Sequence, residues 1–182
     1  MCGLNPNELE RKYSSLANKL RNGTFNDAQI ITELRTISPE TGLFVEKFKE
    51  FEPRAKLARY ILTKINNKLM KDAGQEELAT NNREVNLEHI IPRKMDIVWK
   101  QFFTAKGIKG ESLIKNIGNL TLLLAEYNNK LANKIFTAKK TMYQSSVLPI
   151  NNTLKTFGEF SKTEVESRAT NYASEADSIW SV

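Results

Sequence analysis

Apolar residues recur at helical spacing through most of this chain, and two short segments have a different apolar pattern. Between residues 7 and 72, apolar side chains repeat every three to four positions, which is the spacing of one face of a helix. The same spacing returns over 96–104, 125–144 and 162–180. These stretches predict a mainly α fold to which strands contribute one small element.

Start signals divide the first part of the chain into four predicted helices. The first helix follows a capping asparagine, Asn5 or Asn7, and the second covers 28–37. Ser38-Pro39-Glu40 combines a capping serine with a proline in the first turn, and it predicts the start of the third. Pro53 opens the fourth.

The two exceptional segments are rich in branched apolar residues and predict short strands. The first, EVNLEHII at 84–91, alternates at its start and ends at Pro92, and the second is IGNLTLLL at 117–124. A polar stretch, AGQEELATNN, precedes both. We therefore predict a helical part over 1–75 and a second part over 76–182 that contains the strands, with one compact domain as the alternative.

The rarest side chains limit the chemistry. Cys2 is the one cysteine and His89 the one histidine, which excludes an internal disulfide and any zinc site that needs several cysteines or two imidazoles. The net charge of +6 favours a polyanionic partner, first nucleic acid and second an anionic membrane surface, although many intracellular domains are mildly basic without one. Because no apolar run could cross a membrane or act as a secretory signal, we expect a cytoplasmic protein.

Glu88 and His89 place a carboxylate beside an imidazole in the first predicted strand. Neutral imidazole can accept a proton from water near neutral pH, and a carboxylate can hold a divalent cation. Adjacent residues on a regular strand point to opposite faces, so both reach one phosphate only where the strand ends or bends, which Pro92 permits. The alternative is a histidine that only packs.

Two asparagines in later segments are candidates for the same site. Asn119 lies in a strongly apolar segment, where a buried amide needs partners; it either fixes the histidine by hydrogen bonds or is a turn residue after Gly118. Asn128 offers a neutral oxygen near the start of the next helix, where it can also serve as a cap. Positive charge along that helix comes from Lys130, Lys134, Lys139 and Lys140.

Together these segments resemble the His-Me finger (HNH) nuclease superfamily, and more closely the C-terminal nuclease domain of the GmrSD family of modification-dependent restriction enzymes. The shared features are EHIIP at 88–92, a tryptophan, GNLTLL at 118–123, a helix with the pattern N…N…F…K…Y, and a late R…W. The residues outside the two continuous motifs are Trp99, Asn128, Asn133, Phe136, Lys139, Tyr143, Arg168 and Trp180. The resemblance extends from about Lys56 to Trp180.

The resemblance implies a ββα-metal element set among helices, and an endonuclease that cleaves DNA. His89 would be the general base that activates water, and Asn119 would support the catalytic loop. Glu88 and Asn128 would bind one Mg²⁺, which Mn²⁺ can replace. The metal would neutralise charge that develops at the scissile phosphate.

Further positions complete this interpretation. Some members carry a second helix ligand, which would be Ala132 here and is therefore absent. Asn133 is a candidate for an additional site, but on a continuous helix it faces about 140° away. Arg168 and Trp180 are expected to be structural. The expected contacts with DNA phosphates are Arg93, Lys139 and Lys140.

The resemblance also implies partners. Family members usually carry an N-terminal NTPase domain related to ParB-like folds, and this sequence has no glycine loop that binds phosphate. We therefore expect a C-terminal fragment or a separate subunit of a phage-defence system. Two alternatives remain open on the same residues: an inactive or weak module that binds DNA or a protein, and a nuclease directed at RNA.

Overall fold

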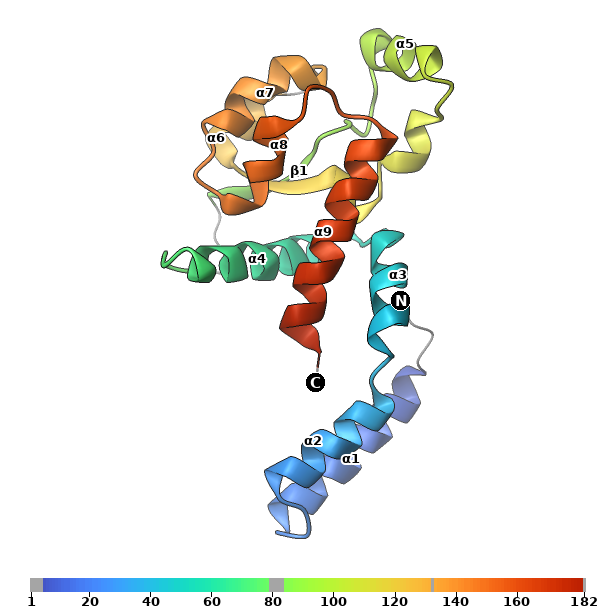
Figure 1. The fold of residues 1–182 in the computed structure, drawn as a ribbon, viewed down its shortest axis with the longest axis vertical. Helices are drawn as coiled ribbons and strands as arrows, with labels where there is room; N and C mark the ends of the chain where they lie inside the picture. Colours follow the sequence, from blue (N-terminus) through green and yellow to red (C-terminus); the bar gives the residue numbers. More distant parts are fainter. Residues whose placement is uncertain (1–4, 79–83, 132, 182) are drawn as a thin grey trace.

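The computed structural model describes residues 5–78, 84–131 and 133–181, without the side chains of 128–130. Its mainly α architecture with one small two-stranded sheet confirms the predicted fold class (Figure 1). The helices are α1 (Pro6–Arg21), α2 (Asp27–Ile37), α3 (Thr41–Lys49), α4 (Ala55–Asp72), α5 (Ile97–Ala105), α6 (Ala125–Leu131), α7 (Phe136–Gln144), α8 (Asn152–Thr156) and α9 (Lys162–Trp180). The strands are β1 (Val85–His89) and β2 (Leu120–Leu124), and short 3-10 helices are η1 (Gly110–Leu113), η2 (Ile117–Asn119) and η3 (Pro149–Asn151).

β1 and β2 form an antiparallel pair in which His89, the last residue of β1, lies opposite Leu120, the first residue of β2. The strand predicted over 84–91 is too long, because the chain bends directly after His89. The strand predicted over 117–124 is also too long, because its first three residues form η2. Both differences place His89 and the end of η2 together at one end of the sheet.

Side-chain caps begin several helices where the sequence predicts them. The Asn5 side chain accepts from the N–H of Asn7 at 3.0 Å, and Ser161 forms a capping box at the start of α9. The start signal at Ser38 is wrong. Ser38 instead ends α2, and its hydroxyl donates to the carbonyl of Leu34 at 2.9 Å, so α3 begins later without a side-chain cap.

The helix predicted over 125–144 is two helices. α6 ends at Leu131 and α7 begins at Phe136, so the connection between them leaves helical geometry. The carbonyl of Lys134 in this connection accepts a hydrogen bond from the indole Nε1 of Trp99 at 3.1 Å. This contact with α5 and the complete burial of Phe136 hold the break in place.

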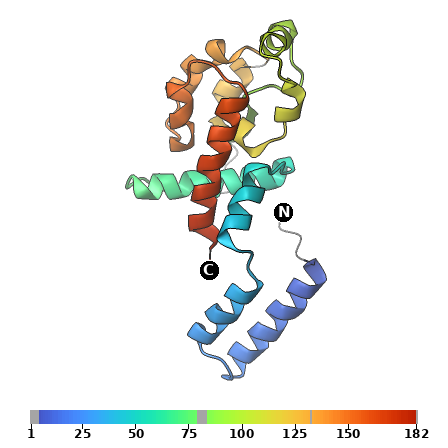
Figure 2. The same ribbon diagram turned by 45° about the vertical axis from the view of Figure 1, so that its right-hand side comes forward.

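Two apolar clusters form the core. The first packs α3, α4 and α9 against the sheet, and α9 crosses α4 in both views (Figures 1 and 2). This cluster takes side chains from both sides of residue 75, which is the predicted boundary between the two parts. The second cluster surrounds Trp99, whose ring stacks on Phe103 with 5.7 Å between centroids. The sheet therefore lies between two packed groups of helices.

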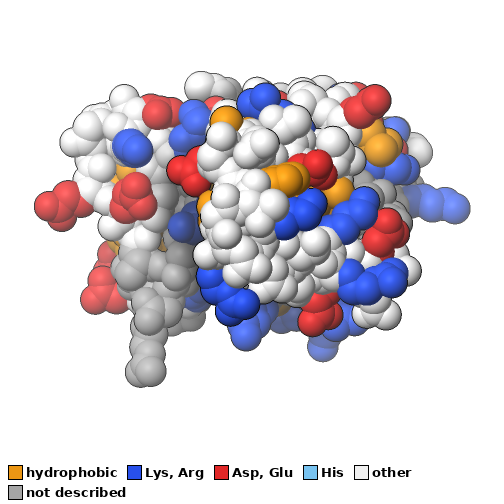
Figure 3. Space-filling model, turned by 90° about the horizontal axis from the view of Figure 1, so that it is seen from below, with side chains coloured by type: hydrophobic (Ala, Val, Ile, Leu, Met, Phe, Trp, Pro, Cys, Tyr) orange, Lys and Arg blue, Asp and Glu red, His pale blue; other side chains and the backbone are white. Residues whose placement is uncertain are grey.

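α1 and α2 form a hairpin that extends away from the rest of the molecule (Figures 1 and 2). It buries Leu16 and Ile37, while Tyr13 and Leu20 are exposed. On the face seen in Figure 3, lysine and arginine side chains lie among aspartate and glutamate. Within the described residues, none of the helices has the length and apolar character that a bilayer crossing requires.

Candidate functional site

His89 lies in an open pocket of about 680 Å³ at the end of the sheet. β1, the loop that follows it and the α6–α7 connection all contribute to this pocket. Its lining consists of Leu87, Glu88, His89, Pro92, Arg93, Lys94 and Asn133. The pocket thus brings together four of the residues predicted for the site, two from β1 and one each from the two connections.

The His89 imidazole is half-buried, and its pKa is lowered from 6.5 to about 4. Burial is the largest cause, because it penalises the charged form, and the positive charges of Arg93 and Lys139 add to it. The imidazole is therefore neutral at physiological pH. A neutral ring that borders an open pocket has the protonation state that a general base requires.

Asn119 holds the loop that follows His89. Its side chain is fully buried; its Oδ1 accepts from the backbone N–H of Ile91 at 2.7 Å, and its Nδ2 donates to the carbonyl of Ile91 at 3.0 Å. Nδ2 also donates to the carbonyl of Ile114 at 2.9 Å, and the Asn119 carbonyl accepts from the N–H of Ile90 at 3.0 Å. A turn residue exposed to solvent would make none of these contacts. This geometry agrees with the predicted support of the histidine loop.

Glu88 is paired with Lys139 rather than left open to the pocket. Glu88 is only 7 % exposed, and its Oε1 accepts from the Lys139 ammonium at 2.7 Å. The ammonium also donates to the carbonyls of His89 at 3.1 Å and Ile90 at 3.2 Å. It is fully buried, so Lys139 belongs to the interior and links α7 to the end of β1.

Burial opposes charge on both members of this pair. It raises the pKa of Glu88, which the charge of Lys139 opposes, and it lowers the pKa of Lys139, which the charge of Glu88 opposes. Burial raises the pKa of the Tyr143 phenol well above its ordinary value, and the charge of the neighbouring Glu88 adds to this shift. The site therefore contains one compact pair of opposite charges beside the neutral imidazole.

The three cations predicted to contact phosphate differ in their surroundings. Arg93 is exposed at the rim of the pocket, as such a contact requires. The prediction for Lys139 is wrong for this conformation, because a fully buried ammonium with three protein acceptors cannot reach a phosphate. Lys140 lies outside the pocket lining and donates to the carbonyl of Phe157 at 2.7 Å. Lys94, which sequence analysis did not select, lines the pocket beside Arg93.

The asparagines after β2 have different outcomes. Asn133 lines the pocket, and the expectation that it faces elsewhere is wrong because α6 ends at Leu131 and no continuous helix fixes its direction. Asn128 lies in α6, but its side chain is outside the described part of the chain, as are Cys2 and Ala132. The role predicted for Asn128 stays a prediction.

The donor atoms that the structure describes do not fit the metal site implied by the resemblance. Glu88 is the carboxylate among the pocket residues, and one of its oxygens already holds the Lys139 ammonium. Within 5–78, 84–131 and 133–181, no three histidine, cysteine, aspartate or glutamate side chains gather as a metal-binding group. A buried ammonium at 2.7 Å from the intended ligand also repels a dication. The described residues therefore do not supply the ligands of a metal site.

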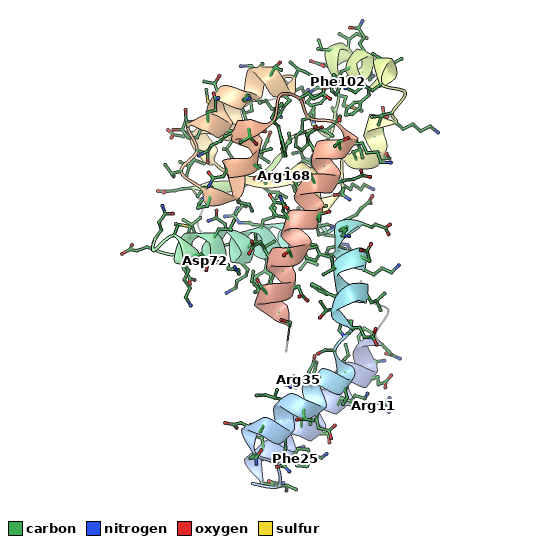
Figure 4. All side chains as sticks on the ribbon, viewed as in Figure 1. Arg11, Phe25, Arg35, Asp72, Phe102 and Arg168 are labelled. Carbon is green, nitrogen blue, oxygen red and sulfur yellow. The ribbon has the colours of Figure 1, made fainter. Side chains whose placement is uncertain are left out.

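Arg168 and Asn151 support the site from behind. Arg168, which α9 directs at the sheet (Figure 4), donates to the carbonyls of Gly118 at 3.0 Å and Leu120 at 3.1 Å, on either side of Asn119. The Asn151 side chain accepts from the hydroxyl of Thr121 and donates to the carbonyl of Leu122 in β2. The late arginine is structural, as predicted; Asn151 was missed, and its only sequence signal is the position of an amide after a proline and an isoleucine.

Comparison with known proteins gives one family whose model matches the part of the chain that contains the site. The family model described as "GmrSD restriction endonucleases, C-terminal domain" matches residues 43–175, which is more than half of the chain. No curated protein matches the sequence. The matched segment begins within α3 and includes the sheet, the pocket residues and most of α9, but it leaves out the α1–α2 hairpin.

Proposed function

The chain belongs to the family of GmrSD restriction endonuclease C-terminal domains, and on this premise we propose that it hydrolyses phosphodiester bonds of DNA with His89 as the general base. Membership makes the chain a restriction-endonuclease domain and implies an N-terminal partner domain and a DNA substrate. We also propose that the domain acts in the cytoplasm, in defence against phage DNA.

The observation that carries the proposal is a neutral imidazole at the edge of an open pocket. In the proposed step His89 takes a proton from water, and the oxygen attacks phosphorus in line with the leaving group. The bond from phosphorus to the 3′ oxygen breaks, and that oxygen takes up a proton from solvent. The products are a 5′-phosphate and a 3′-hydroxyl.

The other pocket residues have proposed roles in binding and positioning. Arg93 and Lys94 at the rim attract the phosphate backbone, which gives affinity independent of sequence and weaker at higher salt. Asn133 lines the same pocket and can donate to a phosphate or sugar oxygen. Asn119 does not touch the substrate and keeps the loop after His89 in place.

The assay is conversion of supercoiled plasmid DNA to nicked or linear forms by the purified chain, with Mg²⁺, with Mn²⁺ and with EDTA. We expect cleavage that leaves 5′-phosphate ends, as read by end-labelling. Mg²⁺ is included because the family resemblance implies it, and the EDTA arm tests that requirement separately from the protein residues. Cleavage that persists in EDTA would show that the reaction needs no divalent metal, and it would leave the proposed role of His89 unchanged.

A weak or inactive module that binds DNA is the second candidate, and the Glu88–Lys139 pair favours it. If no product forms from plasmid under any condition while a labelled duplex still shifts in a gel, this candidate replaces the enzyme. Single-stranded RNA in the same assay distinguishes the third candidate. Faster cleavage of RNA than of duplex DNA would assign the site to RNA.

A further inference from the structure

We propose that Lys139 is a positioning residue which holds the backbone that carries His89, and that Glu88 serves as its counter-ion instead of as a metal ligand. The proposal deepens the proposed function, because it says how the same site is kept in shape. It reverses two roles expected from the sequence, those of a lysine on phosphate and a glutamate on metal.

The ammonium of Lys139 makes three contacts around His89. Lys139 extends from α7 to the end of β1, and its three acceptors belong to three successive residues, Glu88, His89 and Ile90. An ammonium has three N–H groups, and this geometry gives each of them one acceptor. The backbone on both sides of the imidazole is therefore fixed from α7.

Asn119 continues this support along the chain. Asn119 bonds the backbone of Ile90 and both backbone groups of Ile91, so Lys139 and Asn119 together hold residues 88–91. The chain leaves the strand within this segment, where ladder hydrogen bonds no longer support it. The two side chains replace the missing ladder and fix where the His89 ring points.

Glu88 is required as the counter-ion of Lys139. Lys139 is fully buried and Glu88 is 7 % exposed, so either charge alone would lie in the interior without a counter-ion. Removal of one member of such a pair is strongly destabilising, whereas removal of both is often tolerated. A metal ligand must instead face its cation without a competing ammonium.

The experiment uses the single histidine as a reporter. Because His89 is the one histidine, its imidazole gives one pair of ring signals in a carbon-correlated NMR spectrum. The variants are Lys139→Met, the double variant Glu88→Gln/Lys139→Met, and Lys139→Arg as the conservative replacement. The matched control is Lys155→Met, the same substitution at a lysine of α8 whose ammonium donates to the carbonyl of Ser146 at 3.1 Å and lies outside the pocket lining.

We expect the double variant to fold, as judged by circular dichroism, but to shift and broaden the His89 ring signals and to lower kcat by 10- to 100-fold with KM nearly unchanged. Lys139→Arg should restore part of kcat, and Lys155→Met should behave as the wild type. A folded double variant with wild-type ring signals overturns the positioning role. Because the ring signals do not require cleavage, this result is distinct from failure of the proposed nuclease activity.

A second measurement tests the role of Glu88 without any substrate. Mn²⁺ binding is followed by isothermal titration for the wild type and for the double variant Glu88→Gln/Lys139→Met, which leaves neither charge of the pair buried alone. Equal affinity in both proteins, or no binding by either, agrees with a counter-ion. A loss of tenfold or more in the folded double variant assigns Glu88 to the metal and overturns this half of the proposal.

Discussion

His89 is neutral because the folded chain desolvates it and places two cations near it, and this has a measurable consequence. We predict that its ring signals titrate with a pKa of about 4, well below the ordinary 6.5. NMR titration of the single histidine measures this value directly. A midpoint near 6.5 would mean that burial and the charges of Arg93 and Lys139 do not act on the ring as described.

The same shift makes stability depend on pH. As the pH falls from 6.5 to about 4, the unfolded chain binds a proton at His89 while the folded chain does not. The free energy of unfolding therefore decreases over this window. Urea denaturation at several pH values measures the decrease, and His89→Gln, which has no such titration, should show a smaller one. Equal slopes in both proteins would argue against a lowered pKa.

Asn119→Ala removes three side-chain hydrogen bonds and leaves the N–H and the carbonyl of the buried Ile91 without these partners. Since each unsatisfied group costs about 1–3 kcal/mol, we predict a loss of about 3 kcal/mol or more in the free energy of unfolding. Asn133→Ala, at an exposed position, is the control for stability and should change it by less than about 0.5 kcal/mol. Similar losses in both variants would show that the amide of Asn119 is not a clamp.

For single residues, the sequence predicts some roles and not others. Asn119 could be selected because an amide within apolar residues needs partners, and His89 because imidazole is the group that titrates near neutral pH. Lys139 shares a helix face with the buried Phe136 and Tyr143, which indicates that it faces inward, but the sequence does not show its counter-ion, which lies 51 positions away along the chain. Asn133 was misjudged for a related reason, because its direction depends on where α6 ends.

Among the elements, α9 and η2 pack backbone against backbone at Gly118. A Cβ added to Gly118 would lie 2.0 Å from the carbonyl oxygen of Val165 and 2.9 Å from the nitrogen of Ala169, both in the backbone of α9. Gly118→Ala must therefore separate η2 from α9, and we predict a loss of about 3 kcal/mol or more in thermal or urea denaturation. Gly158→Ala meets nothing within 4 Å and should change stability by no more than about 1 kcal/mol. Equal effects would disprove this close packing.

Most helices could be predicted because caps and apolar spacing act locally. α9 is an example, with Ser161 and Glu164 forming its capping box. The division between α6 and α7 could not, because it depends on an indole of α5 that donates to a carbonyl 35 positions later. The bounds of the strands failed for the same reason, since side chains from elsewhere bond the backbone directly after β1 and at the start of β2.

For the whole molecule, the hairpin and the body are expected to be separable. Among the described residues, α1 packs on α2 and makes no comparable contact with the body, and the family match begins after both. Deletion of residues 1–37 should therefore leave cleavage unchanged and lower Tm by less than about 4 °C, which corresponds to about 1 kcal/mol. Differential scanning calorimetry and the plasmid assay check this. Unfolding of the shortened chain would show that the hairpin completes the core.

The proposed function depends most on the chemical role of His89 in the assembled pocket. Its most direct test is the single-turnover rate of duplex DNA cleavage by His89→Ala and by the wild type at pH 7.5, with circular dichroism to verify the fold. We predict a rate at least about 100-fold lower for the variant, which is the contribution of a general base. A folded variant that cleaves within threefold of the wild-type rate would contradict the central claim.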